Sequence, residues 1–263
     1  MPPYVPIRLN MAWTTFNSVQ ANSLILPDWP APANVRAVCS SRLGGHSTGP
    51  YASLNLGQHV ADDPLLVAKN RQLYQQQAQM PAAPLWLNQV HGTDVTLLSS
   101  QSQAGITADA SFTGQAGIVA TVMTADCLPL LLCDATGTQV AAVHAGWRGL
   151  SQGVIEATLA HFATPSQVMV YLGPAISQAA FEVGPEVRAA FVAHNPAAEQ
   201  AFIAGSNGKW LADLYLLARQ RLQAAGVNLV YGGQYCSYQQ AELFFSYRRD
   251  GQTGRMASSI WLV

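Results

Sequence analysis

Residues 125–149, ADCLPLLLCDATGTQVAAVHAGWRG, contain two apolar runs that are separated by the turn sequence ATGT. Two such runs joined by a short connection with a glycine predict a β-hairpin. If the two runs pair symmetrically about the turn, Pro129 lies opposite His144, and strand alternation puts Cys127 on the same face as Pro129. The hairpin therefore predicts that Cys127 and His144 are diagonal neighbours, about 5–7 Å apart at Cβ.

This spacing predicts a metal or thiol site. Zinc bonds to sulfur and nitrogen are about 2.0–2.3 Å long, so Cys127 and His144 can share one ion. His91, in a strand-like run that ends in a turn, is the candidate third ligand. Three protein ligands leave one tetrahedral position open, as in catalytic zinc sites. Taken singly, each residue is also explained as a buried thiol or a hydrogen-bonded histidine, and no CxxC or HExxH pattern supports the site.

The composition is that of a compact globular protein. Of 263 residues, 49% are hydrophobic and 10% are charged, and the net charge is −1. No run of Lys or Arg could neutralise the phosphates of a duplex, so nucleic acid is not an expected partner. We find neither a basic and apolar leader nor about 18 consecutive apolar residues, so we expect a soluble, cytoplasmic protein with no membrane partner. The four cysteines have no paired short spacing and are expected to be reduced.

Strand and helix signals alternate along the chain. The expected elements are strands at 35–41, 117–123 and 168–172, helices at 64–77, 150–161 and 211–225 and from Pro185, and a second hairpin formed by 243–249 and 255–262. This order indicates one mixed α/β domain in which helices cover the sheets. We expect residues 24–263 to form this single domain. Residues 1–23 would be an N-terminal extension, Pro-rich and loosely ordered at its start.

Five segments together resemble a known family. They are Ser41-Arg42 with Gly44-Gly45 and Ser53–Gly57, then Asn88–Gly92, Thr124–Pro129, Val143–Gly149 and Phe244–Asp250. The chain resembles, from about Leu24 to Val263, the YfiH-type family, also called polyphenol oxidase (laccase) domain proteins, purine nucleoside phosphorylases or peptidoglycan editing factors. The resemblance implies a four-layer αββα sandwich with mixed sheets. It also implies a zinc ion held by His91, Cys127 and His144.

The resemblance further implies a zinc-dependent purine nucleoside phosphorylase that acts on adenosine, inosine, guanosine and methylthioadenosine, with an accompanying adenosine deaminase activity. The partners would then be small molecules, a purine nucleoside and phosphate, and the protein a monomer or weak homodimer. Phosphorolysis requires a bound dianion, and Arg42 and Arg148 are the phosphate candidates because both lie in motif loops and offer bidentate donors. In deamination zinc would activate a water molecule, and a carboxylate would move protons.

Asp126, next to a predicted ligand, is the first candidate for that carboxylate, with Asp109 and Glu182 as alternates. Each of these carboxylates is also explained by a structural role. Asn55 and Gln89 lie in two of the motifs and are further candidates for binding substrate.

Four other functions remain open. The first is a zinc amidohydrolase that edits peptidoglycan precursors such as a UDP-muramyl amino acid. The second is a metal-free hydrolase in which His144 activates Cys127. The third is a binding module with structural zinc, which needs a fourth ligand, and the predicted register places Cys133 too near the turn to supply it. The last is a copper-dependent polyphenol oxidase. Six histidines are too few for a multicopper centre, but Cu²⁺ could replace zinc in the single site, with Met123 as a weak axial ligand.

Overall fold

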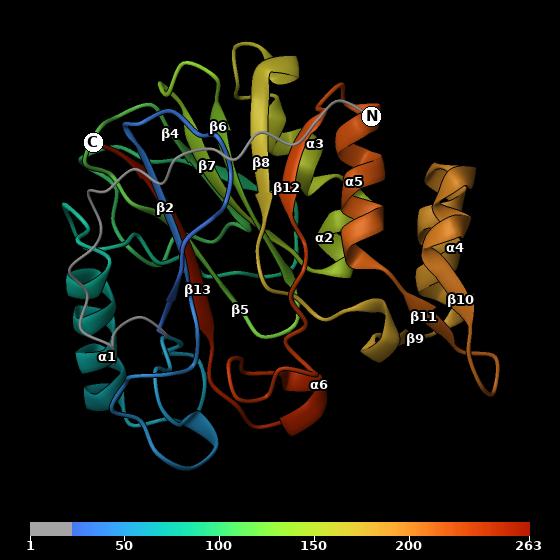
Figure 1. The fold of residues 1–263 in the computed structure, drawn as a ribbon, viewed down its shortest axis with the longest axis horizontal. Helices are drawn as coiled ribbons and strands as arrows, with labels where there is room; N and C mark the ends of the chain where they lie inside the picture. The colour runs from blue at the N-terminus through green and yellow to red at the C-terminus, as the bar shows by residue number, and fades with distance from the viewer. Residues whose placement is uncertain (1–22) are drawn as a thin grey trace, which may run out of the picture.

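The computed structural model describes residues 23–263, and two large sheets stacked face to face form its centre (Figure 1). The predicted N-terminal extension lies outside the described residues, apart from Ser23. The first sheet is antiparallel and has the order β1 (Leu24–Ile25), β2 (Val35–Ser40), β13 (Met256–Leu262), β5 (Ala120–Thr124). The second is mixed and has the order β12 (Leu229–Gly232), β8 (Val168–Leu172), β6 (Leu128–Asp134), β7 (Val140–Ala145), β4 (Ala110–Thr113), β3 (Val95–Leu97).

Helices cover the outer face of each sheet, which makes four layers. Helix α1 (Pro64–Gln77) packs Tyr74 against the four-stranded sheet. On the other side, α2 (Trp147–Gln152), α3 (Val154–Leu159) and α5 (Leu214–Ala224) cover the six-stranded sheet (Figure 1). The predicted αββα sandwich is therefore confirmed, with one mixed sheet and one antiparallel sheet.

Strand alternation divides the apolar residues of the central strands between the layers. In β6, Leu130 faces the helices, whereas Leu131 and Cys133 face the four-stranded sheet. The layer between the sheets is a core in which Leu131, Ala142 and Ile260 are completely buried. His144 has the same parity as Ala142 along β7, so its side chain points into this layer between the sheets.

The observed pairing confirms the predicted register of the central hairpin. Pro129 pairs with His144 and Cys133 pairs with Val140, as the symmetric arrangement about the turn requires. Asp134 fixes the turn, because its Oδ1 accepts the backbone N–H groups of Thr138 and Gln139, each at 2.7 Å. The register on which the predicted site depends is thus held at the turn end by hydrogen bonds.

Some predicted elements have other bounds or other partners. Helix α1 begins and ends as predicted, with Asp63 accepting the N–H of Leu65 as N-cap. The helix expected at 150–161 is two short helices, because Gly153 breaks the chain at φ +104°. The predicted second hairpin is wrong. Ser246 instead caps a short helix, α6 (Tyr247–Asp250). Strand β13 pairs with β2 on one side and β5 on the other, and all seven of its residues are buried.

A smaller unit lies beside α5. It contains α4 (Pro185–His194) and a three-stranded sheet with the order β10 (Phe202–Ala204), β11 (Trp210–Ala212), β9 (Glu182–Val183). Among the described residues no helix could cross a membrane, since none combines the necessary length and apolar character.

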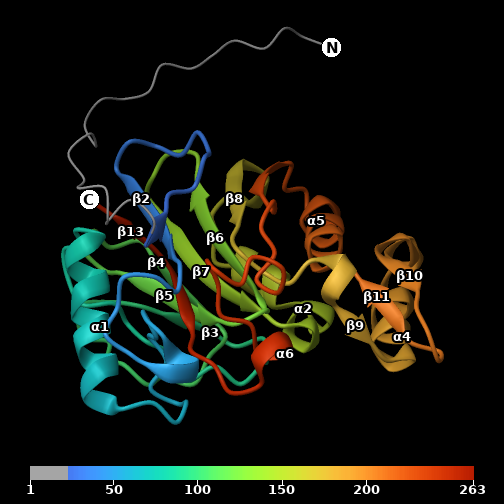
Figure 2. The same ribbon diagram turned by 60° about the horizontal axis from the view of Figure 1, so that its bottom comes forward.

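Helix α6 and the loop that follows β2 lie at the same end of the two sheets (Figures 1 and 2). Backbone hydrogen bonds join these segments, for example from Arg42 N to the Leu243 carbonyl at 2.8 Å. The layer between the sheets opens at this end, where the predicted site residues lie.

Candidate metal centre and active site

The hairpin brings Cys127 and His144 to the open end of the layer between the sheets. With His91 they form a cluster whose ligand atoms all lie within 4.8 Å of one another. The His91 and His144 rings meet edge to face, with centroids 4.8 Å apart. Cys127 Sγ is 3.8 Å from His91 Nε2. These three residues are called the His-Cys-His cluster below.

Asp109 orients both histidines of the cluster. It immediately precedes β4, which pairs with β7, so its side chain lies beside His144. Its Oδ1 is 2.7 Å from His144 Nδ1 and also accepts the backbone N–H of His91 at 2.9 Å. Its Oδ2 accepts the N–H of Gly92 at 2.6 Å. The bond to Nδ1 leaves Nε2 of His144 available as a ligand.

The turn that carries His91 is held in a strained conformation. His91 has φ +61° and Asp126, beside Cys127, has φ +93°, a region that residues with a Cβ seldom occupy. Helix α2 approaches the His91 turn closely, since a Cβ at Gly149 would lie 2.5 Å from the Gly92 carbonyl oxygen. A Cβ at Gly146 would lie 2.7 Å from His91 Cδ2. Small residues in α2 and before it therefore allow the cluster to form.

The residues of the cluster fit a metal ion with nitrogen and sulfur ligands. Tetrahedral zinc with bonds of about 2.0 and 2.3 Å separates neighbouring N and S ligands by about 3.5 Å, close to the observed 3.8 Å between His91 Nε2 and Cys127 Sγ. His144 has its second ring nitrogen fixed by a carboxylate, the arrangement usual for a metal-binding histidine. Among residues 23–263, the His-Cys-His cluster is the one group of three such residues placed to hold a metal.

The charges of the cluster favour a thiolate. Burial alone would raise the pKa of Cys127, but the charge of His144 and hydrogen bonds from both histidines outweigh it and lower this pKa to about 6. Burial would likewise lower the pKa of His144, but the Cys127 thiolate and the Asp109 carboxylate raise it to about 9. Burial also acts against ionisation of Asp109, yet its hydrogen bonds to His144 and backbone amides hold its pKa below the ordinary value. A deprotonated Cys127 is the form that binds metal.

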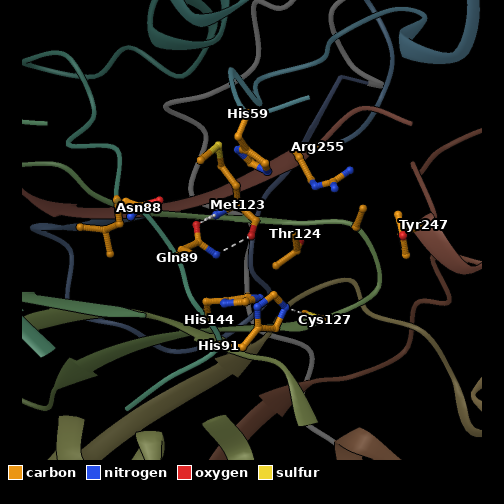
Figure 3. A pocket seen from close by; sticks show the side chains of 12 residues that line it. His59, Asn88, Gln89, His91, Met123, Thr124, Cys127, His144, Tyr247 and Arg255 are labelled. Atoms are coloured by element: carbon orange, nitrogen blue, oxygen red, sulfur yellow. Dashed lines mark hydrogen bonds between the residues drawn. The ribbon is translucent and has the colours of Figure 1, made fainter. Parts of the chain in front are cut away.

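Two cavities flank the cluster and share His91, Ala125, Cys127 and Tyr247. The larger has a volume of about 490 Å³, and its other lining residues are His59, Leu87, Asn88, Gln89, Met123, Thr124, His144 and Arg255 (Figure 3). The smaller has a volume of about 240 Å³, and its other lining residues are Asp126, Trp147, Arg148, Ile176, Phe181, Leu214 and Arg248. A ligand in either cavity would lie against the cluster.

The structure does not bring Arg42 or Asn55 to these cavities. The Arg42 guanidinium donates to the carbonyls of Ala52 and Ala241 and stacks on Phe245. The Asn55 side chain is buried, and its Oδ1 accepts the backbone N–H of Arg255 at 2.9 Å. Asn55 therefore holds in place the segment that carries Arg255.

Gln89, Asp126 and Arg148 do lie at the cavities. Gln89 lines the larger one, although its amide bonds to both backbone groups of Met123, each at 2.8 Å. Asp126 lines the smaller one, and its carboxylate accepts the Ser237 hydroxyl and the Arg248 backbone N–H, each at 2.6 Å.

Arg148 reaches the smaller cavity, whereas Glu182, one of the alternate carboxylates, does not. Arg148 lines that cavity, with its guanidinium 4.5 Å from the Trp147 ring centroid. Glu182 is exposed and lines neither cavity.

Sequence reasoning missed four ionisable residues at the cavities, His59, Tyr247, Arg248 and Arg255. Tyr247 and Arg248 lie within one of the quoted motifs, so the motif was a usable signal. His59 and Arg255 had none, since neither lies in a motif and their proximity depends on the packing of distant segments.

Copper ligation by Met123 is not favoured by its position. Its sulfur lies 3.8 Å from Arg71 Nη2, and Figure 3 shows the side chain directed away from the His-Cys-His cluster. Cys133 is completely buried beyond the cluster, so it does not provide a fourth ligand.

Comparisons with known proteins agree with this fold. Residues 36–263 match the family described as multi-copper polyphenol oxidoreductase laccase. The chain is 53% identical over 243 residues to the purine nucleoside phosphorylase YfiH of Shigella flexneri. The aligned region covers 92% of this chain and 100% of that protein. It is 52% identical over 243 residues to the protein of that name in Escherichia coli (strain K12), with the same coverage.

A solved structure shows the same fold. The crystal structure of Neisseria meningitidis protein NMB0706 is similar with a TM-score of 0.88 and 51% identity, over 91% of this chain and 99% of that one. The family match extends over most of the chain, and the relatives are matched over their whole length. This chain therefore belongs to the YfiH family, which carries the description multi-copper polyphenol oxidoreductase laccase.

Proposed function

We propose that this protein is a zinc-dependent purine nucleoside phosphorylase with an accompanying adenosine deaminase activity. The observation that carries the proposal is the position of the His-Cys-His cluster between two cavities large enough for a nucleoside and a phosphate ion. Relatives that share half of its residues are named purine nucleoside phosphorylases. The proposed substrates are adenosine, inosine, guanosine and methylthioadenosine.

Phosphorolysis requires the protein to bind an anion and a purine on either side of the ribose. An oxygen of hydrogen phosphate forms a bond to C1′, the C1′–N9 bond breaks, and its electron pair leaves with the purine. The proton of hydrogen phosphate ends on the purine, so that charge and atoms balance. The protein's contribution is to position the two reactants and to stabilise charge in a partly dry site.

The residues of the site suit these tasks. Trp147, Phe181 and Tyr247 give the smaller cavity flat apolar surfaces against which a purine can stack. Zinc held by the His-Cys-His cluster would supply Lewis-acid activation of a water molecule for deamination. Asp126 is the one carboxylate among the described residues that lines either cavity, and we propose it for proton transfer.

One experiment tests both activities. Purified protein is incubated with adenosine, with and without inorganic phosphate, and the products are separated by chromatography. Adenine should form only when phosphate is present, and inosine should form in both samples. The absence of both products would contradict the proposal. Metal analysis of protein produced without added copper should show close to one zinc per chain, and one copper instead would replace zinc as the proposed ion.

A metal-free cysteine hydrolase is a second candidate, and a specific contact favours it. Cys127, His144 and Asp109 lie in the order of a nucleophile, a base and an orienting carboxylate. The Cys127 pKa of about 6 would keep the nucleophile ionised at neutral pH. Well-folded protein that contains no metal, and whose activity resists chelators but is lost on alkylation of Cys127, would establish this candidate in place of the phosphorylase.

A further inference from the structure

Within the part of the chain that the structure describes, the larger cavity is lined by one arginine and several imidazoles and by no carboxylate. Its lining contains Arg255 and three histidines, His59, His91 and His144, and among the described residues no Asp or Glu contributes to it. The smaller cavity differs, because the Asp126 carboxylate lies there beside its two arginines. A dianion therefore meets no fixed carboxylate in the larger cavity, whereas it meets one in the smaller.

Arg255 is held firmly but keeps donors available. Its Nη1 donates to the carbonyls of Thr253 and Gly254, each at 3.0 Å. Within residues 23–263, Nε and Nη2 have no acceptor, and no carboxylate lies within ion-pair distance of the guanidinium. Its backbone N–H is fixed by Asn55 Oδ1, and its stem lies against Gly57, where a Cβ would be 2.7 Å from Arg255 Cγ. A fixed guanidinium with free N–H groups is suited to a phosphate oxygen.

His59 lies near this guanidinium. Burial is the main cause of its lowered pKa, and the positive charge of Arg255 is the next. Figure 3 shows His59 and Arg255 on the side of the cavity opposite the His-Cys-His cluster, with Thr124 between the two sides. A ligand between these sides would contact the Arg255 donors at one end and the cluster at the other.

The other arginines near the site do not line the larger cavity. Arg42 donates to backbone carbonyls outside both cavities. Arg148 and Arg248 stack on Trp147 and Phe181 in the smaller cavity, where the aromatic side chains gather. Arg71 donates to the Leu56 carbonyl and stacks on Trp86. Arg255 is thus the arginine best placed to meet an anion in the larger cavity.

We propose that Arg255 and His59 form the subsite that binds free inorganic phosphate in the larger cavity, so that the purine occupies the smaller one. This inference rests on the proposed phosphorylase function. It replaces Arg42 and Arg148 as the phosphate residues, and it makes Asn55 a positioning residue that acts through the Arg255 backbone.

Calorimetric titration with inorganic phosphate tests the subsite without relying on turnover. Arg255→Gln, which removes the charge but keeps much of the stem, should weaken phosphate binding at least about tenfold. Arg255→Lys should recover part of this loss, because it restores a point charge without the fork of donors. His59→Gln should weaken binding about threefold. Arg148→Gln, the matched control in the other cavity, should leave phosphate affinity unchanged. Melting temperatures identify any variant that is not folded, and Arg255→Lys and His59→Gln then carry the test.

The outcomes separate the subsite from the proposed function. Phosphate binding lost in Arg148→Gln but kept in Arg255→Gln would overturn the subsite, as would wild-type protein that binds UDP but not free phosphate. If phosphate binds through Arg255 but no adenine forms from adenosine, the subsite stands and the phosphorylase function fails. If adenine forms and the phosphate KM of Arg255→Gln equals that of the wild type, the function stands and the subsite fails.

Discussion

Cys127 and Cys133 lie six residues apart at the two ends of β6. The pKa of a thiol differs strongly between these two ends of the layer between the sheets. Both side chains face the space between the sheets. Cys133 is completely buried among apolar side chains, and burial, with a smaller contribution from the charge of Asp134, raises its pKa to about 12. Cys127 lies at the open end, where His144 and His91 outweigh burial and lower its pKa to about 6.

The difference shows that burial alone does not make a site. At the closed end apolar neighbours leave a thiol inert, whereas at the open end a carboxylate fixes two imidazoles beside it. The same hairpin supplies both environments, and the register set at the closed end determines which residues meet at the open end. The two ends can therefore be tested against each other with matched substitutions.

The largest contrast is expected between the two cysteines. Cys127→Ala should lose bound metal and reduce activity by a factor of about 100 or more, because it removes a ligand. Cys133→Ala should keep both and lose only about 1 kcal/mol of unfolding free energy for the small cavity that it leaves. Metal content, initial rates and urea denaturation measure these effects. Retained zinc in Cys127→Ala would show that another residue is the sulfur ligand.

The next contrast compares two aspartates that both accept backbone amides. Asp109→Asn should weaken metal binding about 10–100-fold, since the amide cannot orient His144 and His91 as the carboxylate does. Asp134→Asn, at the turn end of the same hairpin, keeps an Oδ1 that can accept the N–H groups of Thr138 and Gln139, so it should leave metal affinity unchanged. Competition with a chromophoric chelator measures the affinity. Equal metal affinity in Asp109→Asn and wild type would mean that backbone packing alone orients the histidines.

Sequence patterns predicted the parts of this layer that depend on local periodicity. Alternation and the turn were sufficient for the hairpin register and for placing Cys127 beside His144, and the capping residues were sufficient for helix α1. The second hairpin failed because β13 is buried on both faces and pairs with strands far away in the chain, which local alternation does not reveal.

The same limit applies to the site. The sequence motif and the turn were sufficient to predict that His91 lies near the hairpin. They did not predict that Asp109 holds His91 in place, because Asp109 was considered only as an alternate residue for proton transfer. Arg255 and His59 are 196 residues apart in the sequence and meet only through the packed loops. The role of Arg42 also depends on structure, because its donors turn out to face backbone carbonyls.

The pH dependence of alkylation in metal-free protein should distinguish Cys127, at the open end of the layer between the sheets, from Cys133 at the closed end. With a pKa of about 6, Cys127 is mostly thiolate at pH 7, and its reaction with iodoacetamide should slow about tenfold between pH 7 and pH 5 as the thiolate is protonated. Cys39 and Cys133, both with pKa values raised to about 12, should stay unmodified in that range. Peptide mass spectrometry identifies the modified residue. Equal labelling of Cys127 at pH 5 and pH 7 would contradict the lowered pKa.

The smallest expected effect comes from one methyl group placed beside the cluster. A Cβ at Gly146 would lie 2.7 Å from His91 Cδ2 and 3.2 Å from Cys127 Sγ, so Gly146→Ala must displace at least one ligand. Gly92→Ala is the control, because its Cβ would make only an ordinary contact, 3.5 Å from Asp109 Oδ2. We expect Gly146→Ala to weaken metal binding about threefold to tenfold, less than the loss of a histidine's hydrogen-bond partner, and Gly92→Ala to leave it unchanged. Neither glycine has a positive φ, so backbone strain does not confuse the comparison. If the two variants bind metal equally well, the cluster is more adaptable than its packing indicates.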